Sequence, residues 1–131
     1  MNTILITNLI KIRWLAIFGQ LTTLLIIKLI FNFNIPLYEC LAVVSISLIV
    51  NLYSSYIQKN NSTLSYEKTF IFLIFDISQL VALLYLTGGI FNPFIILILA
   101  PIIISASYLP AFWTIILSSY SIFLILIINY Y

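Results

Sequence analysis

The sequence contains no histidine, one cysteine and very few charged residues. Without histidine, these 131 residues hold no phosphoacceptor histidine, no imidazole metal ligand and no Ser-His triad. A single cysteine, Cys40, excludes an intrachain disulfide and a multi-cysteine zinc site. Three acidic and five basic residues leave a net charge of +2, too little for a nucleic-acid surface. We therefore expect no catalytic residue, no metal site and no nucleic-acid partner.

Apolar residues are abundant instead. The chain is 64% hydrophobic and 6% charged, whereas a soluble domain carries about 25% charged residues. Its mean hydropathy is +1.26. Each membrane crossing takes about 20 residues, so five crossings nearly fill the chain. The composition predicts an all-α fold: a polytopic integral membrane protein with a bundle of about five transmembrane helices. We expect one membrane domain over residues 1–131, with no cleavable signal peptide and no soluble domain.

Turn residues and polar stretches divide the chain into five apolar runs. A short amphipathic lead ends at Arg13, a polar loop separates the second and third runs, and Pro101 is expected to bend the fourth. The expected spans are residues 14–31, 37–56, 69–86, 92–109 and 112–131.

Basic residues predict the orientation of these spans. Lys11, Arg13, Lys59 and Lys68 fall on one side by alternation, and Lys28 lies on the other. Because basic residues favour the cytoplasmic side, the N-terminus is expected to be cytoplasmic. Five spans would then place residue 131 on the opposite side.

The stretch Gly88-Gly89-Ile90-Phe91-Asn92-Pro93-Phe94 lies between the third and fourth runs. Turn chemistry alone explains much of it, because glycine often follows a helix, asparagine caps the next one and proline suits its first position. A binding site is the alternative interpretation. Glycines allow close backbone approach, and the side chains at positions 91, 92 and 94 supply two aromatic faces and an amide.

This heptapeptide, Gly-Gly-x-x-Asn-Pro-Phe, resembles the ubiquinone-binding signature of the RegB/PrrB family of redox-sensing histidine kinases. The same family pattern covers roughly residues 11–110, through Arg13-Trp14, Gly19-Gln20, Asp76, Gln79 and the run 83–87. The resemblance implies the membrane sensor region of a two-component kinase in the bacterial inner membrane. Ubiquinone would be the sensed ligand, bound by Gly88, Gly89, Phe91, Asn92, Pro93 and Phe94.

The resemblance also implies partners that this sequence does not itself explain. Membrane lipid and quinone would contact the chain directly, whereas a homodimer and a response regulator would require a kinase core. Family members have six spans before a phosphoacceptor region, and the five spans here therefore predict a fragment or truncated product. We expect no kinase activity from this chain alone. The alternative is a stand-alone small membrane protein, either a proton-coupled carrier that uses Asp76 or a minor electron-transport subunit.

Polar residues inside the spans suggest a second feature. Asp76 lies seven residues past Thr69, which corresponds to a depth of about 10 Å. Gln20 and Asn51 are expected at a similar depth in two other helices, with Gln79 one turn further along. We predict a hydrogen-bonded layer of these four residues, because buried polar groups in a membrane pair with one another. A proton-carrying Asp76 remains the functional alternative.

Overall fold

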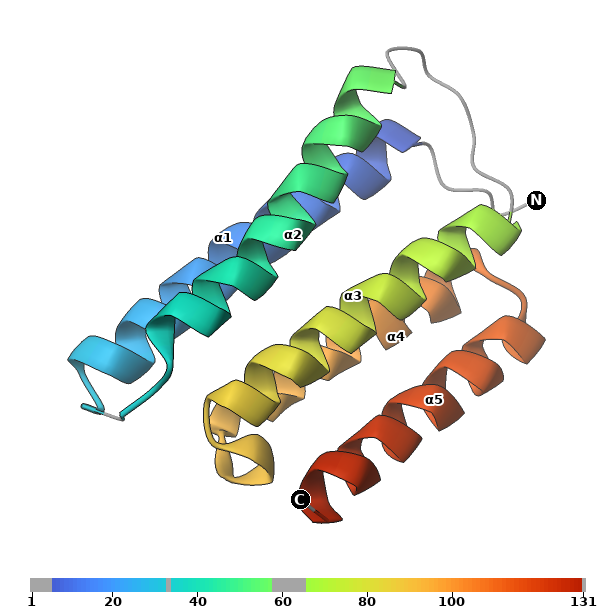
Figure 1. Ribbon diagram of the computed structural model, residues 1–131. Helices are drawn as coiled ribbons and strands as arrows, with labels where there is room; N and C mark the ends of the chain where they lie inside the picture. Colours follow the sequence, from blue (N-terminus) through green and yellow to red (C-terminus); the bar gives the residue numbers. More distant parts are fainter. Residues whose placement is uncertain (1–5, 33, 58–65, 131) are drawn as a thin grey trace.

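The computed structural model describes residues 6–32, 34–57 and 66–130 (Figure 1). That part of the chain forms five α-helices and no strand, which confirms the predicted all-α fold. The helices are α1 (Ile6–Leu29), α2 (Leu37–Ile57), α3 (Tyr66–Leu86), α4 (Leu99–Tyr108) and α5 (Ala111–Tyr130).

Four of these helices are long and apolar enough to cross a membrane. The apolar stretches are Ile10–Leu29, Leu37–Tyr56, Tyr66–Leu86 and Ala111–Tyr130, with hydropathies from 1.5 to 2.2. Twenty helical residues extend about 30 Å, which matches the hydrocarbon core of a bilayer. The chain is therefore a polytopic integral membrane protein.

The first and fourth segments differ from their expected forms. Helix α1 begins at Ile6 and runs through Arg13 without a break, so the expected amphipathic lead is part of the first helix where it is described. The fourth segment is two short 3₁₀ helices, η1 (Gly89–Phe91) and η2 (Pro93–Ile98), followed by α4, which has ten residues. Pro101 is the third residue of α4, where its missing N–H breaks no helical hydrogen bond. The helix type changes from η2 to α4 just before Pro101, and the expected bend at that residue stays a prediction.

Helix α3 occupies the centre of the bundle (Figure 1). It packs against α2 on one side and against η2, α4 and α5 on the other, while α1 packs mainly on α2. The turn after α3 lies at the same end of the bundle as the C-terminal end of α5. Helix α3 therefore connects two helix groups, α1 with α2 and α4 with α5.

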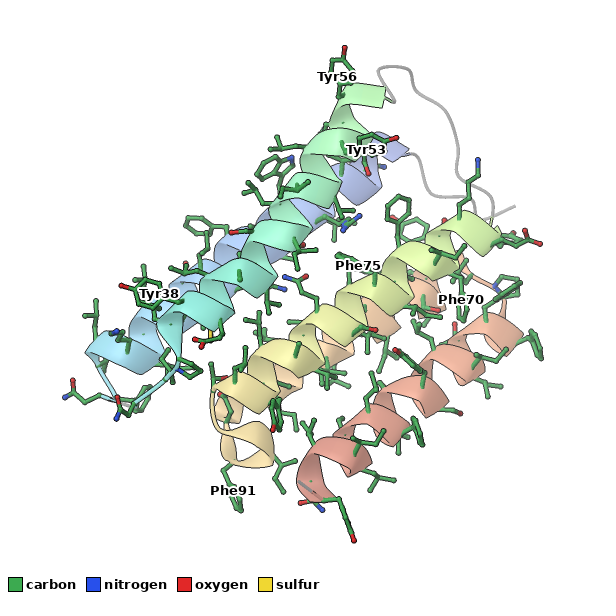
Figure 2. The ribbon with its side chains drawn as sticks, in the orientation of Figure 1. Tyr38, Tyr53, Tyr56, Phe70, Phe75 and Phe91 are labelled. Atoms are coloured by element: carbon green, nitrogen blue, oxygen red, sulfur yellow. The ribbon has the colours of Figure 1, made fainter. Side chains whose placement is uncertain are left out.

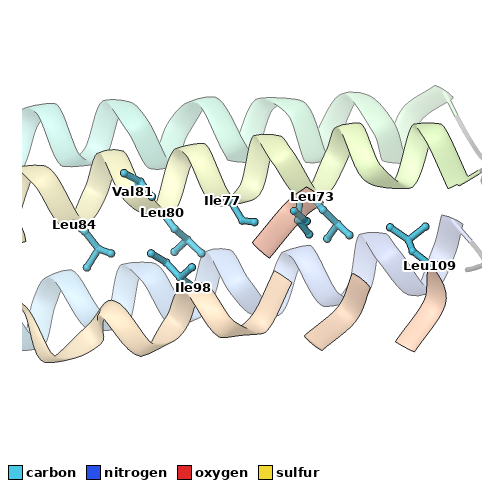
Figure 3. Close-up of a cluster of buried hydrophobic side chains, with 8 residues drawn as sticks. Leu73, Ile77, Leu80, Val81, Leu84, Ile98 and Leu109 are labelled. Atoms are coloured by element: carbon cyan, nitrogen blue, oxygen red, sulfur yellow. The ribbon is translucent and has the colours of Figure 1, made fainter. Parts of the chain in front are cut away.

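The larger hydrophobic cluster lies between α3 and the second of these groups (Figure 3). It contains Leu73, Ile77, Leu80, Val81 and Leu84 of α3, with Ile98, Leu109 and Leu117. Two side-chain hydrogen bonds reinforce this side of the bundle: Ser78 to Tyr120 at 2.7 Å, and Ser105 to Thr114 at 2.9 Å. A smaller cluster of Ile17, Leu24, Cys40, Val44 and Leu83 joins α1, α2 and α3.

Aromatic side chains project from both ends of the bundle (Figure 2). Tyr53 and Tyr56 lie towards the end where α2 finishes, while Tyr38 and Phe91 lie towards the opposite end. All four are exposed on the surface of the chain. This arrangement is typical of the aromatic belts at the two membrane–water interfaces.

Candidate functional site

The turn after α3 depends on its two glycines. Gly88 has a φ of +121° and Gly89 a φ of +65°, backbone angles that residues with a Cβ atom rarely adopt. The backbone N–H of Asn92 donates to the carbonyl of Gly89 at 3.1 Å. The Asn92 side chain also points back, where Nδ2 donates to Thr87 Oγ1 at 2.7 Å. Asn92 is buried, so its amide holds the turn against the end of α3.

The Phe91 side chain, unlike that of Asn92, is exposed. It is 90% exposed and projects from the end of the bundle (Figure 2). Two open depressions lie beside it, with volumes of about 290 and 270 Å³. Gly88 and Phe91 contribute to both depressions, the first of which extends to Asn34 and the second to Asn129.

The last two residues of the heptapeptide are described only in part. Pro93 and Phe94 form the first turn of η2 through their backbone. Their side chains lie outside the described part of the structure. The expected contribution of the Phe94 ring to a quinone site therefore stays a prediction.

Inside the bundle, two polar contacts join α1 to α3. Gln79 Nε2 donates to Gln20 Oε1 at 2.9 Å, and both side chains are buried. Asp76 Oδ1 lies 3.3 Å from Arg13 Nη2. The two helices are thus connected by long side chains, although α1 packs mainly on α2.

Arg13 is the residue whose role sequence reasoning missed. It was expected at the membrane surface as an orientation signal, but its side chain is only 3% exposed. Its guanidinium carbon lies 4.9 Å from the ring centroid of Phe72 and 5.6 Å from that of Phe75, within cation–π range. A signal was present, because Arg13 and Gln20 are seven residues apart and share one helix face. Ionisable residues within a membrane also commonly pair with one another.

Asn51 does not join these contacts. Its side chain is fully buried, and neither Nδ2 nor Oδ1 has a hydrogen-bond partner within the described residues. Of the four residues expected in one polar layer, Gln20 and Gln79 are therefore bonded to each other, and Asp76 pairs with Arg13.

A cavity of about 290 Å³ adjoins these polar contacts. Its polar side is formed by Arg13, Gln20, Ser47, Asp76 and Gln79, which come from α1, α2 and α3. Its remaining lining is apolar or small: Ile12, Leu15, Ala16, Gly19, Leu80, Leu97, Ala100, Pro101 and Ile104. The cavity thus offers a polar wall and an apolar wall within the membrane-spanning part of the bundle.

These features define a class: a polytopic helical membrane region with a glycine turn at one end and a buried ion pair between helices. The sequence is 36% identical over 124 residues to the sensor histidine kinase RegB of Cereibacter sphaeroides. That alignment covers 95% of this chain and 27% of the relative. The chain is a RegB-like N-terminal membrane region, which confirms the resemblance predicted from the sequence.

A second sensor histidine kinase RegB, from a designated strain of the same species, is 35% identical over 73 residues. This alignment covers 56% of the chain and 16% of that relative. The chain therefore spans about a quarter of the length of the curated relative that it matches over most of its residues. No family model matches the sequence, and no solved structure matches it.

Proposed function

We propose that this chain is the membrane sensor region of a histidine kinase and that it detects the redox state of quinone at the turn 88–94. The sensor role is supported by the 36% identity to the sensor histidine kinase RegB over 95% of the chain. The four helices able to cross a membrane fit a region that samples a lipid-soluble signal.

The quinone role rests on one structural observation, the exposed Phe91 ring beside the two glycines. A quinone has two carbonyl acceptors, a flat ring and an apolar tail. Gly89 begins η1, where the first N–H groups of a helix have no acceptor within that helix, so it offers a donor. Phe91 offers a flat face, and the depressions beside it offer apolar contact.

The hydrogen bonds of the turn support different roles for its residues in this proposal. Because the Asn92 amide donates to Thr87 Oγ1, Asn92 maintains the turn conformation, and the Gly89 N–H is the proposed donor to a quinone carbonyl. A neutral hydrogen bond contributes about 1 kcal/mol net, and an aromatic contact about 0.5–1.5 kcal/mol. The resulting affinity is modest, as a sensor requires if it is to release its ligand when the quinone pool changes.

The proposed setting is the bacterial inner membrane, with the N-terminal end of α1 in the cytoplasm. Lys11 and Lys68 lie near the cytoplasmic ends of their helices in this orientation, and Lys28 lies near the other end of α1. Of the other two basic residues in the orientation argument, Arg13 is buried beside Asp76 and Lys59 lies outside the described residues. The glycine turn is then periplasmic. Dimer formation and phosphotransfer to a response regulator would belong to a protein that includes a kinase core.

Quinone titration of the chain in lipid nanodiscs tests this function. Phe91→Ala should weaken ubiquinone binding several-fold, because it removes the exposed ring from the turn. Phe112→Ala is the matched control, since Phe112 is 67% exposed and starts α5 near the opposite end of the bundle. Circular dichroism should show equal helical content in all three proteins. Equal binding by wild type and both variants would remove the basis for a quinone site at the turn.

The ion pair of Asp76 argues against the alternative of a proton-coupled carrier. Asp76, the residue that such a carrier would use, lies 3.3 Å from the buried Arg13. A carboxylate that compensates a buried cation serves as a structural partner.

A further inference from the structure

The cavity between α1, α3 and α4 is separate from the turn. Its lining residues include none of those that form the two depressions beside Phe91. Its volume of about 290 Å³ is larger than ordinary packing defects, which seldom exceed the size of a water molecule. The quinone site proposed at the turn therefore does not account for it.

Arg13 brings unused hydrogen-bond donors to this cavity. The side chain is 3% exposed, and its Nε and Nη2 have no hydrogen-bond partner within the described residues. Nη2 lies 3.3 Å from Asp76 Oδ1 as an ion pair, but without hydrogen-bond geometry. Buried donors without acceptors are costly and rare in folded proteins. The cavity thus presents an arginine whose N–H groups would be satisfied by an oxygen atom placed beside it.

The charges around the cavity determine which kind of oxygen acceptor could bind beside Arg13. Asp76 balances the charge of Arg13, and the polar wall is completed by the uncharged Gln20, Gln79 and Ser47. A carboxylate or phosphate entering this site would meet the Asp76 carboxylate in a medium of low dielectric constant, where like charges repel strongly. A neutral carbonyl oxygen would accept from Arg13 without that repulsion.

The small residues around the cavity explain why it remains open. A Cβ atom added at Gly19 would meet nothing within 4 Å, and Ala100 lines the opposite side with a single methyl group. Long side chains of α1 and α3 bridge the space, so the helices need not close it. The apolar lining, which includes Leu97 and Ile104, suits the body of a lipid-soluble molecule.

We propose that this cavity is a second, intramembrane binding site for a lipid-soluble molecule with a neutral carbonyl head, which accepts a hydrogen bond from the Arg13 guanidinium. A quinone head group belongs to this chemical class, and its identification as the occupant rests on the proposed function. Because Arg13 belongs to α1 and Asp76 to α3, occupancy of the cavity would alter the contact between those two helices.

Benzophenone tests the site without assuming a quinone. It is a neutral aryl ketone, and on illumination its carbonyl carbon forms a bond to a nearby C–H carbon while its oxygen takes the hydrogen atom. The full chain in lipid vesicles would be labelled and the modified residues located by peptide mass spectrometry. We expect labelling at cavity residues of α1 and α4, such as Ala16 and Ile104. Gly19→Phe should reduce this labelling at least several-fold by filling the cavity, whereas Gly19→Ala should preserve it.

Two further variants make the test decisive. Ala100→Phe fills the cavity from the opposite side, and circular dichroism identifies whichever filled variant retains its helices. Arg13→Lys keeps a positive charge opposite Asp76 but lacks the planar donor group, so labelling should fall several-fold. Unchanged labelling in folded, cavity-filled variants would overturn the site. Unchanged labelling in Arg13→Lys would overturn the assignment of Arg13 as its donor.

Competition by ubiquinone separates this inference from the proposed function. Loss of cavity labelling when ubiquinone is added would support a quinone as the occupant. Cavity labelling that ubiquinone does not reduce would support a neutral-carbonyl site and overturn the quinone assignment. If Phe91→Ala weakens quinone binding while labelling avoids the cavity, the proposed function stands and the second site is refuted.

Discussion

The two faces of α3 illustrate two ways of holding membrane helices together. The face towards α4 and α5 is apolar, with Leu73, Ile77 and Leu84 buried in a continuous cluster. The face towards α1 carries Asp76 and Gln79, whose contacts are an ion pair and a hydrogen bond beside a cavity. The face towards α4 and α5 is closely packed, whereas on the face towards α1 long polar side chains make contacts beside an open cavity.

The difference follows from lipid as the solvent. Lipid tails are as apolar as leucine, so the apolar face is held by close packing of complementary shapes. The polar face cannot be exposed to lipid without a large cost, so Asp76 and Gln79 require partners on α1. Apolar packing thus fixes α3 against α4 and α5, whereas the polar contacts fix the position of α1 and leave room for a ligand.

The largest effect is expected from breaking the ion pair. Asp76→Leu leaves Arg13 buried without its countercharge, and loss of one partner of a buried pair costs about 3–5 kcal/mol. The free energy of unfolding in detergent should fall by this amount. Glu67→Leu is the matched control, because Glu67 is an exposed acid in the first turn of the same helix and should cost less than about 1 kcal/mol.

The double variant Arg13→Leu/Asp76→Leu distinguishes the pair from its separate members. Replacing both partners of a buried ion pair by apolar residues is often neutral for stability. The double variant should therefore be more stable than Asp76→Leu. If the two losses were simply additive, Arg13 and Asp76 would not be coupled.

A smaller effect is expected on the apolar face. Leu73 is 1% exposed in the cluster, so Leu73→Ala opens a space there and should cost about 2 kcal/mol or somewhat more. Ile71 lies two residues earlier on α3 and is 64% exposed, facing lipid in our topology. Ile71→Ala should change the free energy of unfolding by less than about 0.5 kcal/mol. Similar losses for both variants would show that shape complementarity does not hold this face together.

Much of this arrangement could be predicted from the sequence. Hydrophobic runs revealed the helices because a membrane helix must satisfy its backbone hydrogen bonds internally. The form of the fourth segment could not be predicted in this way, since hydropathy does not distinguish an α-helix from the 3₁₀ helix η2. The heptapeptide indicated the turn correctly, and the positive φ values of Gly88 and Gly89 agree with it.

The candidate site was predictable only in its composition. Gln20, Asn51, Asp76 and Gln79 stood out as polar residues in apolar helices, but their partners depend on how each helix is rotated. Arg13 was placed before the first span, as one of the basic residues that favour the cytoplasmic side of the membrane. Its burial against Phe72 and Asp76 is a tertiary contact between α1 and α3 that a pattern within one helix cannot reveal.

The smallest expected effect concerns two glycines, Gly89 in the turn and Gly19 beside the cavity. A Cβ atom would find open space at both Gly19 and Gly89, so only the backbone conformation distinguishes the two substitutions. Gly19 lies within α1, and Gly19→Ala should raise the free energy of unfolding by about 0.4–1 kcal/mol by restricting the unfolded chain. Gly89 has a φ of +65°, and Gly89→Ala should lower the free energy of unfolding by about 1 kcal/mol or more. Chemical denaturation of the two variants in the same detergent provides the measurement. Opposite signs would mean that glycine at position 89 is required by the turn, whereas position 19 has room for a methyl group beside the cavity. A loss of stability in Gly19→Ala would instead mean that this glycine permits close packing, and the cavity would need another explanation.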